Sequence, residues 1–341
     1  MEASIHTEHS DNTSTTQWHV LGAGAMGCMW AAALQAAGHQ VSLIVRHSAQ
    51  LMHYPGQIVV EDAATNTSES FEIAAWEAEY GPPAASRPVR WLMVATKAQD
   101  VSRALTEIAP WLGSDATIVL LQNGLRVQQQ LSAQYGDRIL CLTSSHGAWM
   151  RAPWHVVRAG IGEAWLGQLN AQGLSTRSEA ALARLPVNET RLRYDADIKQ
   201  RLWRKFAINC AINALTVVHD CRNGELLDGG RRQQQLQALC EEIEVILEAL
   251  AQHRGADIPE LAAVLTPVLT PDLYTQVEAV LRATASNVSS TLQDVRRGRS
   301  TELPHLNGYL ITLAEAAGVA APRNIALMAD IEHCARIPAH P

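Results

Sequence analysis

The sequence has few of the patterns that mark metal-binding, disulfide-bonded, nucleic-acid-binding or membrane proteins. Its six cysteines are scattered without a C-x-x-C pair, and its thirteen histidines show neither H-x-x-x-H nor H-E-x-x-H spacing. These absences argue against a metal site and a disulfide framework, and they fit the reducing cytoplasm. A net charge of −7 without a basic stripe argues against nucleic acid as a partner. No apolar run is long enough to cross a bilayer, so we expect no membrane partner.

The composition is that of a globular protein. The chain has 341 residues, of which 47% are hydrophobic and 18% charged, and this length allows two domains with cores of their own. The first 17 residues are polar and lack the basic and apolar regions of a signal peptide. We predict that residues 1–17 form a disordered extension.

The most informative segment is a glycine-rich turn. A short apolar strand beginning at Trp18 runs into Gly22, Gly24 and Gly27, which have G-x-G-x-x-G spacing, and an Ala-rich helical run follows. The first glycine permits a tight turn, the second lets a pyrophosphate approach the backbone, and the third lets helix and strand pack closely. The helix N-terminus offers unpaired N–H groups to phosphates. A purely structural turn is the alternative, but this context favours dinucleotide binding.

The end of the next strand indicates which dinucleotide. NAD-binding chains usually carry Asp or Glu there, about 20 residues past the glycines, to bind the ribose 2′-hydroxyl. This chain has Arg46 at that point and no acid until Glu61. A guanidinium can pair with a 2′-phosphate, whereas a carboxylate would repel it. Unless Arg46 is only a solvated charge, the sequence favours NADP(H).

Strand-like and helix-like runs alternate through the first half of the chain, as in a doubly wound sheet. Trp91–Thr96 and Thr117–Leu121 are continuously apolar, which is typical of strands buried on both faces. We interpret 57–60 and 70–75 as a hairpin or loop excursion, and 156–159 and 164–169 as antiparallel edge strands that close the sheet. Further runs predict strands at Val41–Val45 and Ile139–Thr143 and a helix at Val101–Trp111.

The second half has helical periodicity throughout. Amphipathic segments are predicted at Asp195–Val218, Arg231–Gly255, Asp272–Thr284, Leu306–Ala317 and Arg323–Ile337. We therefore predict an α/β Rossmann-type N-terminal domain at 18–193, followed by an all-α C-terminal domain at 194–341. The active site is expected in the cleft between them.

The first of these helices carries an unusual polar stripe. Lys205, Asn209 and Asn213 recur at i, i+4 and i+8 and share one helix face, while the intervening residues are mostly apolar. Burying these groups is costly unless each finds a partner, and a polar ligand in a cleft would supply partners. A solvated helix face is the alternative, although Asn is a poor helix former there.

Other polar residues are candidates by position. Asn123 and Lys97 follow buried strands, where the carboxyl ends of parallel strands meet a cofactor crevice. Asn223 lies in an R-N-G-E-L turn, and the run N-V-S-S from Asn287 to Ser290 is also compatible with a simple helix N-cap.

Taken in this order, the motifs resemble the ketopantoate reductases (2-dehydropantoate 2-reductases), NADPH-dependent enzymes of pantothenate biosynthesis. The resemblance covers nearly the whole chain after the extension. Its most specific pieces are W-R-K-F-A-I-N-C-A-I-N-A-L-T around Lys205, C-R-N-G-E-L around Asn223 and N-V-S-S-T-L-Q-D-V from Asn287.

The resemblance implies a role for each matching residue. Lys205 is implied to be the general acid that protonates the ketone oxygen as hydride arrives. The implied substrate-binding residues are Asn123, Asn209, Asn213, Asn223 and Ser290. The implied cofactor-binding residues are Gly22, Ala23, Gly24, Ala25, Met26, Gly27, Arg46, Lys97, Asn123, Ala148 and Glu302.

The leading hypothesis is therefore NADPH-dependent reduction of 2-dehydropantoate to (R)-pantoate. One alternative is a reductase of the same fold that acts on another 2-keto acid; another is an NADP(H) sensor without catalysis, against which Lys205 argues. Two residues depart from the family pattern, Arg126 after the N-G pair and Pro304 after Glu302. Apolar surface on the helical domain would be compatible with a homodimer.

Overall fold

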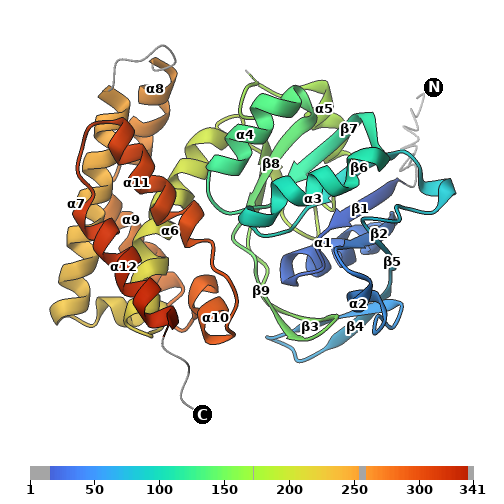
Figure 1. Ribbon diagram of the computed structural model, residues 1–341, viewed down its shortest axis with the longest axis horizontal. Helices are drawn as coiled ribbons and strands as arrows, with labels where there is room; N and C mark the ends of the chain where they lie inside the picture. Colours follow the sequence, from blue (N-terminus) through green and yellow to red (C-terminus); the bar gives the residue numbers. More distant parts are fainter. Residues whose placement is uncertain (1–15, 172, 253–258, 337–341) are drawn as a thin grey trace, which may run out of the picture.

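The computed structural model describes residues 16–171, 173–252 and 259–336, which form two parts (Figure 1). Strands and helices alternate up to Tyr194, and every described element from Ile198 onward is helical. This confirms the predicted fold class, a Rossmann-type sheet followed by an all-helical region. Of the predicted extension, 1–17, only Thr16 and Gln17 are described; Gln17 opens the first strand, and the Thr16 carbonyl accepts from the Gln40 N–H at 3.1 Å.

An eight-stranded sheet forms the body of the first part, in the order β12-β11-β8-β7-β6-β1-β2-β5. From β8 to β5 all strands are parallel, whereas β11 pairs antiparallel with β8 and β12 runs parallel to β11. The strands are β1 (Gln17–Leu21), β2 (Gln40–Val45), β5 (Ala74–Glu77), β6 (Val89–Val94), β7 (Leu112–Leu120), β8 (Ile139–Ser144), β11 (Ala164–Gly167) and β12 (Leu192–Tyr194).

The central strands of this sheet are buried on both faces over most of their length and are largely apolar there, as their sequences predict. Neighbouring residues belong to opposite cores; for example, Val119 lies in one hydrophobic cluster and Leu120 in the other. Helices α1 (Ala25–Ala36) and α5 (Thr176–Leu182) contribute to the first cluster, and α3 (Val101–Ile108) and α4 (Arg126–Tyr135) to the second.

A separate four-stranded sheet, in the order β4-β3-β10-β9, packs beside α1 (Figure 1). Its strands are β3 (Gln57–Asp62), β4 (Ser68–Glu72), β9 (Gly147–Ala152) and β10 (His155–Gly160). The predicted hairpin is confirmed in part: β3 pairs antiparallel with β4, but the predicted second segment, 70–75, is divided between β4 and β5 of the main sheet. The interpretation of 156–159 as an edge strand of the main sheet is wrong, because β10 pairs with β3 and β9 instead. Its apolar residues indicated a buried strand but could not indicate which strand it pairs with.

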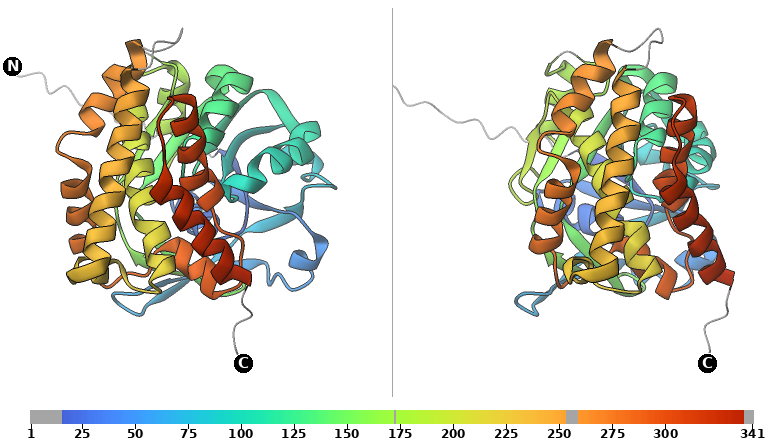
Figure 2. Two further views of the ribbon diagram at one scale, coloured as in Figure 1. Left: turned by 60° about the vertical axis from the view of Figure 1, so that its left-hand side comes forward. Right: turned by 90° about the vertical axis from the view of Figure 1, so that its left-hand side faces the viewer.

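The second part contains the five predicted helices and two more. They are α6 (Ile198–Val218), α7 (Gly230–Gln252), α8 (Pro259–Val268), α9 (Leu273–Ala283), α10 (Ser290–Arg296), α11 (Asn307–Ala316) and α12 (Pro322–Arg336). The sequence did not predict α8, and it indicated α10 only through the alternative of a helix N-cap at 287–290. The remaining short helices are α2 (Ser48–Leu51), η1 (Ala84–Ser86), η2 (Ala98–Asp100), η3 (Ala109–Trp111), η4 (Gly136–Arg138), η5 (Asn223–Leu227) and η6 (Leu303–His305). In the right-hand view of Figure 2 the long helices stand side by side in front of the sheet.

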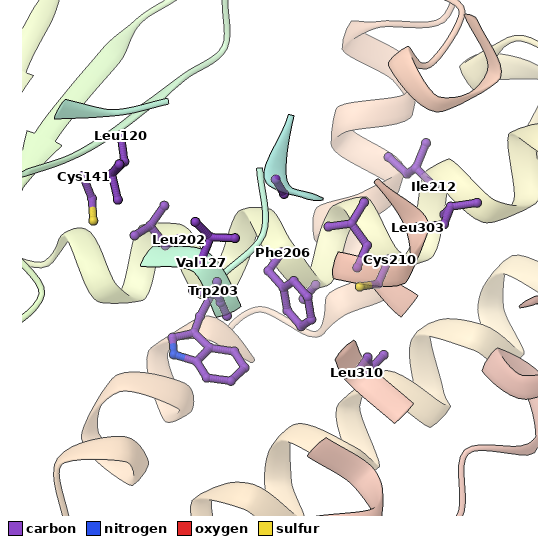
Figure 3. Packing of buried hydrophobic residues seen from close by; sticks show 14 of the residues in the cluster. Leu120, Val127, Cys141, Leu202, Trp203, Phe206, Cys210, Ile212, Leu303 and Leu310 are labelled. Atoms are coloured by element: carbon purple, nitrogen blue, oxygen red, sulfur yellow. The ribbon is translucent and has the colours of Figure 1, made fainter. Parts of the chain in front are cut away.

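Helix α6 joins the two parts into one hydrophobic core (Figure 3). Leu202, Trp203 and Phe206 are buried on this helix. They belong to the same cluster as Leu120 and Cys141 of the sheet, so the polar stripe of α6 is anchored against the carboxyl ends of the strands. Among the described helices none combines the length and the apolar character that crossing a membrane requires.

Candidate active site

The glycine-rich turn between β1 and α1 has the close packing that its spacing predicts. Gly22 has φ +106° and donates its N–H to the Ile44 carbonyl at 3.0 Å. A Cβ on Gly27 would lie 1.9 Å from the Gly22 carbonyl oxygen, so only glycine fits there. A Cβ on Gly24, the N-cap of α1, would meet nothing within 4 Å. The turn is thus closed toward the strand and open at the helix N-terminus, where a phosphate would approach.

A cavity of about 970 Å³ opens beside this turn, at the carboxyl ends of β1, β2 and β6. Its wall contains five of the predicted cofactor residues: Gly22, Ala23, Gly24, Arg46 and Lys97. The others do not line it: Ala25, Met26, Gly27, Asn123, Ala148 and Glu302. Five of its lining side chains are cationic at pH 7 and two are acidic, so the cavity suits an anionic ligand. The cations are Arg46, Lys97, Arg151, Arg297 and Arg299, and the acids are Asp100 and Glu107.

Arg46 lies at the end of β2, as predicted, and is held by a partner that the sequence did not reveal. Its Nη2 lies 2.7 Å from Oδ1 of Asp100, in η2, and the two side chains are 32% and 27% exposed. The same oxygen accepts from Arg103 at 2.8 Å. Arg46 is therefore not simply a solvated charge.

The helical part supplies one side of the cavity. Arg297, Arg299 and Ser300 line it, although they are far from the glycine turn in sequence. Lys97 fixes this segment, since its Nζ lies 2.8 Å from Oδ2 of Asp294 and donates to the Ser300 carbonyl at 2.7 Å. The basic run R-R-G-R at 296–299 contributes two of these lining residues, but nothing in its sequence indicated this cavity.

Glu302 joins two more predicted residues at the same junction. Its Oε1 accepts from the Ala98 N–H at 3.1 Å, and its Oε2 accepts from Asn123 Nδ2 at 3.1 Å. These contacts bring the loops after β6 and β7 against the helical part.

Lys205 lies at the boundary between the two parts. Its Nζ donates to the Ser144 carbonyl at 3.0 Å, at the carboxyl end of β8. Burial lowers the pKa of Lys205 to about 8, and the negative charge of Glu302 opposes part of this change. The ammonium is thus still mostly charged at pH 7 but gives up its proton far more readily than a solvated lysine.

The rest of the polar stripe lacks side-chain partners. Within the described residues, the Asn209 and Asn213 side chains make no hydrogen bond, and Asn213 is buried. Since α6 is a continuous helix across all three positions, the predicted shared face is confirmed.

Asn223 and Ser290 lie around the C-terminal end of α6. Asn223 Nδ2 donates to Thr284 Oγ1 at 2.9 Å, while its Oδ1 is buried without a partner. Ser290 is exposed at the first position of α10; the buried Ser289 caps that helix and accepts from the Leu292 N–H at 3.1 Å. The N-cap interpretation of this run is therefore confirmed for Ser289. No described hydrogen bond joins Asn223 or Ser290 to Lys205.

His146, near the end of β8, is a neighbour of Lys205 that the sequence reasoning did not single out. Its Nδ1 accepts from the Gly162 N–H at 2.9 Å, which leaves Nε2 to donate to the Thr190 carbonyl at 3.0 Å. Burial lowers the pKa of His146, and the positive charge of Lys205 contributes. This histidine is therefore neutral around pH 7 and above.

The two departures from the family pattern lie at the interface between the parts. Arg126 begins α4, and its guanidinium lies 5.9 Å from the centre of the Tyr309 ring on α11. Pro304 is part of η6. Within 16–171, 173–252 and 259–336, no group of three or more His, Cys, Asp or Glu side chains could hold a metal ion.

Comparison with known proteins places this site in a family. The ketopantoate reductase PanE/ApbA profile matches residues 18–171, and its C-terminal counterpart matches residues 197–334. The chain belongs to the ketopantoate reductase family. Its members are oxidoreductases, and the relatives and structural neighbours imply a nicotinamide cofactor.

Individual relatives agree with this membership. The chain is 30% identical over 317 residues to the 2-dehydropantoate 2-reductase of Vibrio cholerae, covering 92% of this chain and 96% of the relative. It is 26% identical over 317 residues to that of Archaeoglobus fulgidus, covering 91% and 94%. Among solved structures, D-mandelate dehydrogenase with NADH and anilino(oxo)acetate shares the fold, with a TM-score of 0.77 at 19% identity and coverage of 94% and 98%.

Proposed function

We propose that this ketopantoate reductase-family protein reduces 2-dehydropantoate to (R)-pantoate with NADPH, as a step of pantothenate and coenzyme A biosynthesis. The observation that carries the proposal is Lys205, an ammonium of lowered pKa held at the carboxyl end of β8 beside partnerless amides on the same helix face. The curated relatives named 2-dehydropantoate 2-reductase support the substrate.

The cavity fits the cofactor that the family implies. The open face at Gly24 leaves room for a pyrophosphate at the N-terminus of α1, and the excess of lining cations favours its charge. When bound, the nicotinamide supplies the hydride. Arg46 is the proposed reader of the 2′-phosphate, and this assignment supports NADPH over NADH.

Lys205 is the proposed general acid. Reduction of a ketone builds negative charge on its oxygen, and a cation that also donates a proton stabilises that charge twice over. With a pKa of about 8, Lys205 carries its proton at pH 7 and releases it at a small free-energy cost. The Ser144 carbonyl orients the ammonium without neutralising it.

The amides are the proposed substrate contacts. Asn209 and Asn213 would bind the polar groups of a small hydroxy-keto acid without adding charge, and the orphaned Asn223 Oδ1 is available to a hydroxyl. Asn123 and Ser290 complete the proposed set. Ala148, Ala25, Met26, Gly27 and Glu302 remain proposed cofactor contacts, although they do not line the cavity.

The test is NADPH oxidation at 340 nm with 2-dehydropantoate, 2-oxoisovalerate and pyruvate as parallel substrates. We expect a clear preference for 2-dehydropantoate and a loss of at least about 10²-fold in kcat for Lys205→Met. Cofactor binding by that variant, measured by fluorescence titration, should stay within about threefold of wild type and serves as the control for folding.

Other results would overturn parts of the proposal. Preferential turnover of another keto acid would retain the mechanism and replace the substrate. Cofactor binding with no reduction of any of the three acids would leave a binding protein rather than a reductase. The expected homodimer and cytoplasmic location are separate predictions; sedimentation velocity and cell fractionation test them.

A further inference from the structure

Asp100 is an acid placed where the cofactor site needs a cation. It lies in η2, directly after β6, and lines the cavity. Its Oδ1 lies 2.7 Å from Nη2 of Arg46 and 2.8 Å from Nη2 of Arg103. Both Arg46 and Asp100 are more than half buried, so solvent screens this pair less than a fully exposed one. Arg46, the proposed binding residue for the 2′-phosphate, is thus already paired with a carboxylate before any cofactor binds.

We propose that Asp100 weakens the discrimination between NADPH and NADH that Arg46 provides, and so makes the site tolerant of both cofactors. This inference rests on the proposed function only for the assignment of Arg46 to the 2′-phosphate. A phosphate that pairs with Arg46 must share or displace the Asp100 carboxylate, and the two anions repel each other. The 2′-hydroxyl of NADH carries no charge, so its binding escapes that repulsion, and a nearby carboxylate can accept from it.

Of the two carboxylates that line the cavity, Asp100 is the one that contacts Arg46. Among the residues lining the cavity, the other carboxylate is Glu107, which lies 3.9 Å from Arg103 and makes no described contact with Arg46. Lys97 is held by Asp294 on the helical part. Glu107 therefore offers a matched control, because it carries the same charge on the same wall without touching the phosphate reader.

The experiment compares Asp100→Asn with Glu107→Gln. Dissociation constants for NADPH and NADH are measured by nicotinamide fluorescence titration, and kcat/KM is measured with each cofactor. For Asp100→Asn we expect the NADPH-over-NADH affinity ratio to rise about tenfold, which corresponds to about 1.4 kcal/mol. For Glu107→Gln we expect a change below about twofold, and Asp100→Glu should keep the wild-type ratio.

Two further variants test whether Asp100 changes the affinity ratio through Arg46 or through Arg103. In an Arg46→Gln background, Asp100→Asn should raise the ratio clearly less than in the wild type, because the competition for the guanidinium is gone and only the direct repulsion of the phosphate remains. Asp100→Asn also frees Arg103. The same rise in an Arg103→Gln background would show that the freed Arg103 is not its cause.

Three results would overturn the inference. They are an unchanged ratio in Asp100→Asn, an equal rise in Glu107→Gln, and a rise that is undiminished without Arg46. Should Asp100→Asn fail to fold by circular dichroism, Asp100→Ser replaces it. The dissociation constants need no keto acid, so they test the inference even if the proposed substrate is wrong. If Arg46→Gln leaves NADPH affinity unchanged, it is the cofactor assignment in the proposed function that fails.

Discussion

The lowered pKa of Lys205 predicts how the activity of this protein depends on pH. A general acid must carry its proton, so activity is lost as pH rises through the pKa in the folded protein. With that pKa at about 8, kcat/KM should be level near pH 7 and fall about tenfold per pH unit above pH 8, to about one hundredth at pH 10. A solvated lysine, with its usual value of 10.5, would retain nearly full activity at pH 9.

The size of the pKa change follows from the surroundings of Lys205. Lowering a pKa from 10.5 to about 8 corresponds to about 3 kcal/mol against the charged form, and the main cause is burial of the ammonium on α6. The Glu302 carboxylate opposes this change, so Glu302→Gln should move the falling limb to lower pH. Burial lowers the pKa of His146 below its usual value, so its titration should not contribute to a limb above pH 8.

The assay is kcat/KM for the keto acid at saturating NADPH from pH 6 to pH 10 and constant ionic strength. Lys205→Arg is the matched control, because an arginine stays charged over the whole range and any residual activity should lack the falling limb. A wild-type limb above about pH 9.5, or the same limb in Lys205→Arg, would refute the assignment of the limb to Lys205.

Unfolding can be distinguished from deprotonation of Lys205 as the cause of the fall in activity. Because the pKa of Lys205 is lower in the folded than in the unfolded chain, its burial costs stability below pH 8, and this cost disappears as pH rises toward 10.5. The contribution of Lys205 to stability thus improves over the range in which activity falls. Thermal melts at each pH provide this check.

The remaining predictions concern single positions. Gly27→Ala should destabilise the fold by about 3 kcal/mol, because its Cβ would overlap the turn backbone. Gly24→Ala should leave the melting temperature unchanged yet weaken NADPH binding about tenfold, since its Cβ points into open space at the helix N-terminus; thermal melts and titrations read out both. Arg46→Gln should weaken NADPH binding by about tenfold or more and NADH binding by less than about threefold in the same titration. Asn307→Ala should cost about 2 kcal/mol in urea unfolding, because this buried amide donates to a carbonyl of α6 and to a side chain of α12.

Several features of the fold could be predicted because they depend on local spacing. The glycine turn is one, since the 1.9 Å approach at Gly27 follows directly from the third position of its motif. The polar stripe on α6 is another, because a period of four residues places side chains on one face of any helix. The periodicity of the short α10 was not recognisable over seven residues, so only its N-cap run indicated a helix there.

The pairing of β10 shows where local pattern stops being informative. An apolar run such as 156–159 is compatible with any buried strand position. Which strand it pairs with depends on which strand edges remain unpaired once the rest of the chain has packed. The same limit applies to charged residues. Arg46 was predicted to read a phosphate, but its partner Asp100 lies 54 positions away, and no spacing rule connects the two.

The sequence by itself determined the class of cofactor, the order of the two parts and the helix face that carries Lys205, because each depends on residues within a few turns of one another. Only the tertiary structure decided that Arg297, Arg299 and Ser300 line the same cavity as the glycine turn, that Asp100 holds Arg46, and that burial lowers the pKa of Lys205 to about 8. Burial and charge pairing depend on segments that meet through packing of the whole chain, and that packing cannot be read from the spacing of neighbouring residues.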